Sequence, residues 1–224
     1  MNTEPSVRSR RPPRRQTCLV ALGTVCVLAA PHVGVPMFLY PVLGLILCTA
    51  MLRYQGLGWA QVGFRWRALG AGPLLTGGIL GIAYVAANVG VIGPLLAGLL
   101  HERPDLSDFA FVRAHLSGYL IALALAWVVG GFYEELVFRG FLQDALSRHL
   151  PASGARPVLA AVFTVLAFAA YHCQLGTFGV ANALVFAVFA AAIRWRWPGN
   201  LGHVIAFHAC ADMGAFTLMR LGYL

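Results

Sequence analysis

Residues 116–139 read LSGYLIALALAWVVGGFYEELVFR. The first 18 of them contain no Asp, Glu, Lys or Arg; two adjacent carboxylates, Glu134 and Glu135, follow at once, and Arg139 lies four positions later. An uncharged run of this length is typical of a membrane-spanning helix, which needs about 20 mostly apolar residues. Ionisable groups inside such a helix are costly and by default indicate function. This stretch therefore predicts a membrane protein and marks a candidate functional site in it.

Three more stretches lack any charged residue, namely 16–52, 68–100 and 157–193. The 224-residue chain is 59% hydrophobic and only 11% charged, whereas soluble domains are about 25% charged. This composition excludes a soluble globular domain, a disordered chain and a nucleic-acid-binding module. We therefore expect a protein embedded in the lipid bilayer, without a nucleic-acid partner.

The apolar pattern predicts an all-α, polytopic fold, a bundle of about seven transmembrane helices. We place these helices at 17–31, 36–52, 73–92, 117–148, 157–173, 178–194 and 200–220. Gly77 and Gly81 have the spacing of closely packed helices. Gly93-Pro94 is expected to break or kink the third helix, and 101–115 is expected to form a loop.

The arginines predict the orientation of the bundle. The chain has no Lys, and five of its 16 Arg lie in the first 15 residues. Three more lie in 53–67 and two in each of 148–156 and 194–199, whereas loop 101–115 holds two Arg and three acids. Because Arg-rich loops stay in the cytoplasm, we expect a multi-pass protein of the cytoplasmic (inner) membrane with a cytoplasmic N-terminus.

The polar residues in the apolar helices are few, and their spacing relates them. Residues four apart share a helix face, so Glu135 and Arg139 are expected to pair, and His208 and Asp212 to point the same way. Glu134 lies about 100° around the helix from Glu135, which directs it toward other helices.

A second relation links two helices of the predicted hairpin. Glu134 lies 19 residues before the turn at Ser153, and His172 lies 19 residues after it, so the two side chains are expected at the same depth. His208 on the last helix is expected nearby. His203 faces about 140° away from His208 and is expected outside the site, and Phe168 is expected to serve in packing.

The sequence lacks the motifs of several protease classes. It has no His-Glu-x-x-His of a zinc metalloprotease, no Gly-x-Ser-Gly of a serine protease and no pair of transmembrane Asp residues for an aspartyl mechanism. Four hypotheses remain. Glu134 could activate a water for hydrolysis, or Glu134, His172 and His208 could bind zinc. The polar groups could instead hold together a non-catalytic immunity or scaffold protein, or relay protons in a small transporter.

Three motifs in this order, Glu134-Glu135-x-x-x-Arg139, Phe168-x-x-x-His172 and His208-x-x-x-Asp212, resemble the CPBP family. This family of CAAX-type proteases and bacteriocin-processing or immunity proteins, also called ABI, includes the Ras-converting CAAX endopeptidase of the endoplasmic reticulum. The resemblance covers residues 134–212. It implies an intramembrane glutamic endopeptidase that uses no metal, with zinc as the less favoured alternative.

The resemblance also implies a role for each residue. Glu134 would be the general base, assisted by His172; His208 and Asp212 would stabilise the oxyanion; Glu135 and Arg139 would support the site. The family often has Asn at the position of Asp212. An ionised Asp cannot donate to an oxyanion, so Asp212 would either be held neutral by burial or orient His208 as an ion-pair partner.

The predicted organisation and partner follow from this resemblance. Residues 1–16 would form an Arg-rich cytoplasmic tail, 17–115 the N-terminal transmembrane helices and loops, and 116–220 the catalytic core. The substrate would be a membrane-embedded or membrane-anchored protein or peptide, cleaved at a C-terminal anchor, a sorting signal or a leader. Recognition is expected within the membrane or at its cytoplasmic face.

Overall fold

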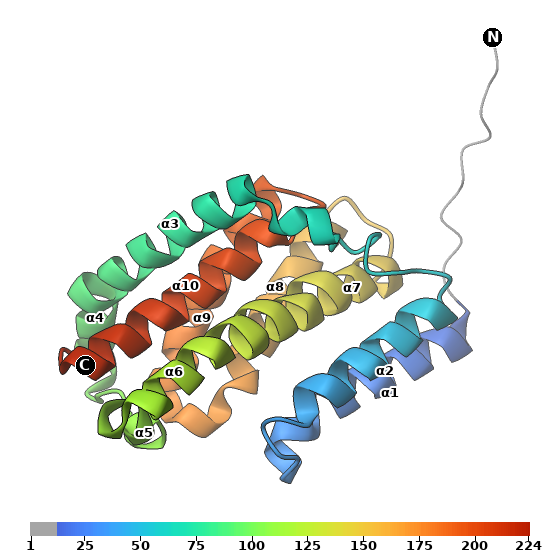
Figure 1. Ribbon diagram of the computed structural model, residues 1–224. Coiled ribbons are helices and arrows are strands. Elements are labelled where there is room, and N and C mark those ends of the chain that lie inside the picture. The colour runs from blue at the N-terminus through green and yellow to red at the C-terminus, as the bar shows by residue number, and fades with distance from the viewer. Residues whose placement is uncertain (1–12) are drawn as a thin grey trace.

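The fold is a bundle of seven long helical segments (Figure 1), described for residues 13–224 by a computed structural model. Arg8, Arg10 and Arg11 of the predicted tail lie outside the described residues. The long segments are α1 Arg14–Ala29, α2 Tyr40–Tyr54, α3 Ala71–Ala87 with η3 Asn88–Ile92 and α4 Gly93–Leu100, α6 Leu116–Leu125 with η5 Ala126–Glu134, η6 Leu136–Leu142 and α7 Gln143–His149, α8 Arg156–Tyr171, α9 Gly176–Arg196, and α10 Gly202–Leu221. The short helices are η1 Ala30–Val33, η2 Trp66–Leu69, η4 Ser107–Phe109, α5 Ala110–Ala114 and η7 Cys173–Leu175.

The surface of this bundle is that of a membrane protein. Five helices are long and apolar enough to cross a bilayer, and α2 and α8 are shorter apolar helices. Large apolar side chains such as Leu22, Ile46 and Leu75 are exposed on the outside, where a soluble monomer rarely shows wide apolar patches. The predicted all-α, multi-pass membrane fold is confirmed.

α10 is the central helix of the bundle. It packs against α3, α6, η5 and α9, and every residue from Gly202 to Ala209 is buried. Its contact with α3 depends on the predicted glycines, because a Cβ on Gly77 or Gly81 would overlap a backbone carbonyl oxygen of α10. The two helix backbones therefore touch, as small residues at helix interfaces allow.

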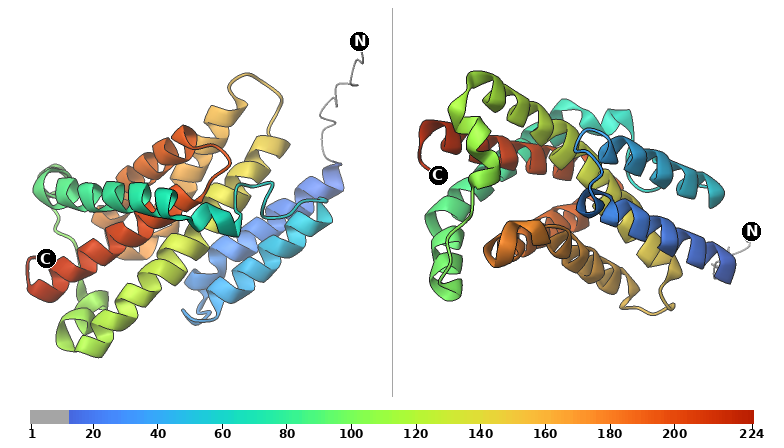
Figure 2. Two further views of the ribbon diagram at one scale, coloured as in Figure 1. Left: turned by 45° about the horizontal axis from the view of Figure 1, so that its top comes forward. Right: turned by 90° about the horizontal axis from the view of Figure 1, so that it is seen from below.

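Gly93-Pro94 kinks the third segment, as expected, without ending it: the π-helical turn Asn88–Ile92 precedes it, and the chain changes direction into α4 (Figure 2). A wider turn accommodates a proline, which lacks an N–H and crowds the preceding turn. Residues 101–115 are only partly a loop, since Ser107–Phe109 and Ala110–Ala114 are helical.

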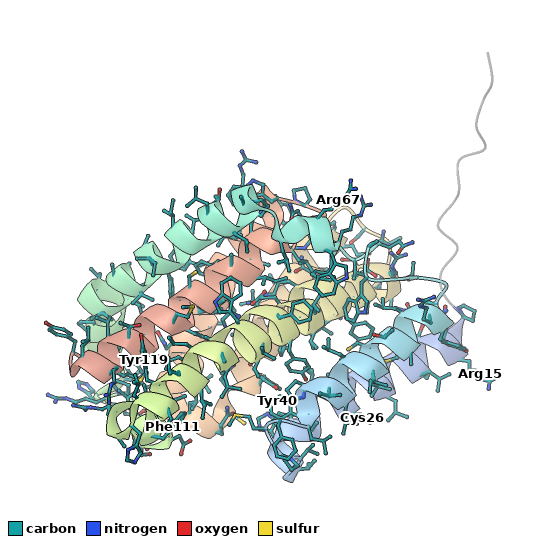
Figure 3. All side chains as sticks on the ribbon, viewed as in Figure 1. Arg15, Cys26, Tyr40, Arg67, Phe111 and Tyr119 are labelled. Atoms are coloured by element: carbon teal, nitrogen blue, oxygen red, sulfur yellow. The ribbon has the colours of Figure 1, made fainter. Side chains whose placement is uncertain are left out.

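One end of the bundle gathers the arginine-rich connections. This Arg-rich end comprises residues 53–70, 148–156 and 194–201. The backbone N–H of Leu201 donates to the carbonyl of Gly63 at 3.0 Å, which joins two of these connections. Arg15 and Arg67 both lie toward this end in Figure 3.

The opposite end holds the other connections. It comprises residues 30–39, 101–115, 172–175 and 222–224. The rings of Phe109 and Phe216 lie 5.6 Å apart there and join the loop after α4 to the end of α10. Phe111 and Tyr119 lie toward this end, away from Arg15 and Arg67 (Figure 3).

Candidate active site

The adjacent carboxylates Glu134 and Glu135 lie where two π-helical segments meet. η5 ends at Glu134, and η6 begins directly after Glu135. π-helical turns are rare in proteins, and those that occur are often found at functional sites. Every residue from Tyr133 to Leu142 is buried, so both carboxylates lie inside the bundle. Nothing in the residue pattern indicates this wide winding.

Glu135 is paired through one of its two carboxylate oxygens, while its buried Oε2 accepts no hydrogen bond from the described residues. Its Oε1 accepts one hydrogen bond from Nη1 of Arg139 at 3.1 Å and a second from Nδ1 of His208 at 2.6 Å. The predicted pair with Arg139 is therefore present, and His208 is an additional partner that the spacing did not predict. Arg139 is 1% exposed, and its guanidinium lies 4.2 Å from the ring centroid of Phe168. Phe168 thus contributes a cation–π contact besides packing.

Glu134 has a different environment. It is 8% exposed, and its Oε2 accepts no hydrogen bond from the described residues. This oxygen lies 3.9 Å from Nε2 of His208, so the two glutamates flank opposite nitrogens of one imidazole. Glu134 is also among the residues that line a cavity.

His208 and Asp212 share a helix face, as their spacing predicts. Oδ2 of Asp212 lies 3.5 Å from Nε2 of His208, and the Asp212 side chain is 35% exposed. Because a carboxylate oxygen only accepts hydrogen bonds, Nδ1 of His208 donates its proton to Glu135. Nε2 is then the atom of this ring that faces Glu134, Asp212 and any bound group.

His172 is the first residue after α8. Its Nδ1 lies 2.8 Å from the carbonyl oxygen of Phe168, and since a carbonyl only accepts, Nδ1 carries the proton and donates it. In the neutral ring Nε2 is then an acceptor. Glu134 and His172 line the same cavity.

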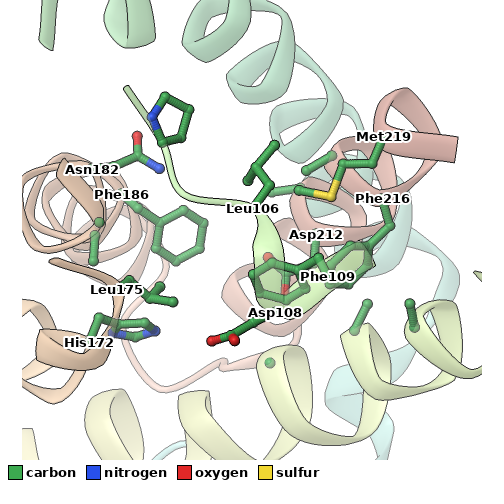
Figure 4. Close-up of a pocket in the computed structure, with 18 of the residues that line it drawn as sticks. Leu106, Asp108, Phe109, His172, Leu175, Asn182, Phe186, Asp212, Phe216 and Met219 are labelled. Carbon is green, nitrogen blue, oxygen red and sulfur yellow. The ribbon is translucent and has the colours of Figure 1, made fainter. Parts of the chain in front are cut away.

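The cavity has a volume of about 660 Å³, within the range of small-molecule pockets, about 300–1,000 Å³. Glu134, His172, His208 and Asp212 are among the residues that line it. Around them are largely apolar and aromatic residues, among them Leu106, Phe109, Leu175, Phe178, Phe216 and Met219. Figure 4 shows His172 and Asp212 on opposite walls, with the segment around Leu106 and Asp108 across the opening.

Two further acids lie at the mouth of this cavity. Asp105 and Asp108 line it and are exposed, and the Asp108 carboxylate points into it in Figure 4. Hydrogen bonds from the side chain and the backbone N–H of Ser107 hold the pKa of Asp105 below its usual range. Asp105 is therefore ionised at neutral pH.

His203 lies outside this site, as expected. Its ring stacks on Trp197, with centroids 4.3 Å apart and planes 7° from parallel. It is absent from the residues that line the cavity.

Gly130 is a site residue that sequence reasoning missed. A Cβ there would overlap Oδ2 of Asp212 and lie 3.2 Å from Nε2 of His208. A Cβ on Gly131 would lie 2.8 Å from the carbonyl oxygen of Ile205. The two glycines therefore let the helix of Glu134 approach α10. The signal was a Gly-Gly pair about one turn before the two glutamates.

Within residues 13–224, no three His, Cys, Asp or Glu side chains are grouped so as to hold a metal ion. Glu134, His172 and His208, which a zinc site would use, line the cavity without forming such a group.

A family model described as type II CAAX prenyl endopeptidase Rce1-like matches residues 116–214. This range begins at the first residue of α6, ends within α10 and contains all six polar residues of the site. No curated protein and no solved structure matches the chain.

Proposed function

We propose that the protein hydrolyses a peptide bond within the membrane with a water activated by Glu134, since residues 116–214 match the Rce1-like family model of type II CAAX prenyl endopeptidases. The observation that carries the glutamic mechanism is the contrast between two neighbours. Glu135 accepts two hydrogen bonds, whereas Oε2 of Glu134 accepts none from the described residues and its carboxylate lines the cavity.

The first step is proton transfer from water to Glu134. The resulting hydroxide attacks the carbonyl carbon of the scissile bond, and the carbonyl oxygen becomes an oxyanion. A preorganised donor next to that oxygen lowers the barrier. Nε2 of His208, when protonated, is such a donor, and its ring is held by the 2.6 Å hydrogen bond to Glu135.

The second step is collapse of the tetrahedral intermediate. The C–N bond breaks, and the leaving nitrogen takes up the proton that Glu134 received. Nε2 of His172 accepts or relays a proton within the cavity that it shares with Glu134, because its Nδ1 is committed to Phe168. Arg139 supports the site by neutralising Glu135, and Asp212 orients His208 or donates to the oxyanion.

The remaining parts of the proposal concern context. The reaction uses no metal. The protein lies in the cytoplasmic membrane with its N-terminus in the cytoplasm, and its partners are the bilayer and a membrane-embedded or membrane-anchored protein or peptide. The Arg distribution supports the orientation, and the apolar cavity walls support a substrate that comes from the membrane.

The test compares cells that express the wild type, Glu134→Gln or the control Glu102→Gln. Gln preserves the shape of Glu134 but cannot take a proton, whereas Glu102 is exposed and does not line the cavity. Protein termini are quantified by mass spectrometry. We expect termini that depend on the wild type to persist with Glu102→Gln and to fall by about 10²–10⁴-fold with Glu134→Gln, the usual contribution of a general base.

Three outcomes would count against the proposal. Identical termini with wild type and Glu134→Gln would indicate a non-catalytic immunity or scaffold protein. Cleavage by purified protein that a chelator abolishes and zinc restores would indicate the zinc mechanism. Uptake driven by a pH gradient without any peptide product would indicate a transporter.

A further inference from the structure

The cavity that holds the site opens at the end of the bundle opposite the Arg-rich end. We propose that the substrate reaches the site from the non-cytoplasmic face of the membrane. The substrate class is then an exported, membrane-anchored polypeptide whose scissile segment is presented on that face. This inference rests on the proposed function for the cleavage itself, but the direction of access is a property of the fold.

The residues that line the cavity extend in one direction from the site. Along α10 they run from His208 to Met219, toward the end of the helix. On the helix that carries the glutamates they run from Ala122 to Glu134 and stop there. No residue of 41–83, 135–167 or 187–207 lines the cavity. The space therefore begins at Glu134 and His208 and continues away from the Arg-rich end.

The path toward the Arg-rich end is filled with side chains. All residues from Leu136 to Leu142 are buried, and Phe138 is fully enclosed. The pair of Glu135 and Arg139 lies in this layer. Below it, a Cβ on Gly140 would lie 3.1 Å from a methyl carbon of Leu201. Buried side chains therefore fill the layer between the site and the Arg-rich end.

A second cavity lies nearer the Arg-rich end but does not reach the site. Its volume is about 540 Å³, and its lining residues are Leu45, Thr49, Trp59, Ala60, Phe64, Arg65, Trp66, Phe132 and Leu136. None of these residues lines the first cavity. This second space is therefore not an entrance to Glu134.

The charges at the two ends of the bundle indicate which side of the membrane the cavity faces. The connections 53–70, 148–156 and 194–201 contain seven Arg and no acidic residue. The connections at the opposite end and the last turn of α10 contain Arg103, Arg113 and Arg220, balanced by Glu102, Asp105 and Asp108. Short loops rich in Arg remain in the cytoplasm, so the mouth with Asp105 and Asp108 faces away from it. This differs from the expected recognition at the cytoplasmic face.

The lining of the outer cavity indicates the chemistry of the incoming segment. Leu106, Phe109, Phe178 and Phe216 form apolar walls between the exposed mouth and the polar site. Such walls favour an apolar stretch of chain, because burying apolar surface is stabilising by about 25 cal/mol per Å². The anchor segment of an exported protein, entering from the outer leaflet, fits this description.

The first test measures the direction of access without using activity. In a full-length variant whose five native cysteines are replaced, Asp105→Cys places a thiol at the mouth, and Gly154→Cys places a matched exposed thiol in the 148–156 turn. Each is treated with a membrane-impermeant maleimide in right-side-out and in inside-out vesicles. We expect Asp105→Cys to react at least tenfold faster in right-side-out vesicles and Gly154→Cys to show the reverse.

The second test asks whether the interior of the cavity is reached from the same side. Ala215→Cys places a thiol on the cavity wall, and a small cationic methanethiosulfonate reagent is used as the probe. We expect this thiol to react from the side that labels Asp105→Cys. Faster reaction from the side that labels Gly154→Cys, or Asp105→Cys reacting in inside-out vesicles alone, would overturn the proposal.

The third test concerns the substrate class. Among the termini that depend on Glu134, we expect new ends to map to non-cytoplasmic segments next to membrane anchors. New ends in cytoplasmic segments would overturn the proposal. Absence of any such termini would contradict the proposed protease instead, and the labelling of Asp105→Cys and Ala215→Cys would still decide the direction of access.

Discussion

Glu134 and Glu135 are neighbours in the chain, but their surroundings are opposite. The side of the site around Glu135 is closed, and its Oε1 accepts hydrogen bonds from Arg139 and His208. The side around Glu134 borders the cavity, and its Oε2 accepts no hydrogen bond from the described residues. Two donors stabilise a buried acid, whereas a buried acid without donors destabilises the fold and is retained where function requires it. The proposed function assigns support to Glu135 and chemistry to Glu134, within one helical turn.

The largest expected effect is on the Glu134 side. Glu134→Gln should lower the rate of cleavage by about 10²–10⁴-fold, because the amide cannot accept the proton of water. The thermal unfolding midpoint should stay the same or rise, since a buried carboxylate without donors is removed. The measurement pairs initial rates on a substrate identified from the termini with thermal unfolding in detergent. A large loss of stability would show that Glu134 supports the fold and would end its contrast with Glu135.

The second effect is expected on stability. Glu135→Ala should destabilise the protein by about 3–5 kcal/mol, because Arg139 is left buried without its counter-charge. Chemical unfolding in detergent measures this loss. The double variant Glu135→Met/Arg139→Met should recover most of it, since it removes both charges and keeps the volume. Equal stability of Glu135→Ala and wild type would mean that the pair contributes nothing to the fold.

The contrast between the two glutamates was only partly predictable from the sequence. The uncharged runs predicted the seven helices, and the spacing of Glu135 and Arg139 predicted their ion pair, because these features depend on local sequence alone. The second partner of Glu135, His208, depends on how α10 packs beside η5, and that packing depends on Gly130 and Gly131.

The winding and the cavity are also properties of the packed bundle. Hydrogen bonds between residues five apart, which define η5 and η6, have no signature in the apolar pattern. The direction in which the cavity opens follows from the side chains that fill the layer below Glu135. The catalytic roles of Glu134, His172, His208 and Asp212 remain predictions.

A smaller effect is expected at Gly130, which lets the helix of Glu134 approach α10. Gly130→Ala introduces a Cβ that overlaps Asp212 and crowds His208. Overpacking of this kind costs about 1–3 kcal/mol, and a displacement of about 1 Å at a catalytic group costs up to about 10²-fold in rate. Initial rates and thermal unfolding check both values. Gly98→Ala is the matched control, because it lies on helix α4 with no atom within 4 Å of its added Cβ, and its rate should equal that of the wild type.

The smallest effect is expected at Asp212. Asn can replace it as a donor to the oxyanion but not as a charged partner that orients His208. The ring of His208 is already held by Glu135 at 2.6 Å, whereas Asp212 lies 3.5 Å away and is 35% exposed to the cavity. A partly exposed pair contributes about 0.2–1 kcal/mol, so Asp212→Asn should change the rate by less than about fivefold. Its amide can also donate to an oxyanion, which an ionised Asp cannot do. Asp212→Leu, which can neither donate nor accept, should be slower than Asp212→Asn if this position touches the oxyanion, and equally fast if it does not. The rate is measured as kcat at saturating substrate. A loss of 100-fold or more in Asp212→Asn would instead assign the charge of Asp212 an essential role. His208 would then depend on a charged partner at both of its nitrogens, Glu135 on one side and Asp212 on the cavity side.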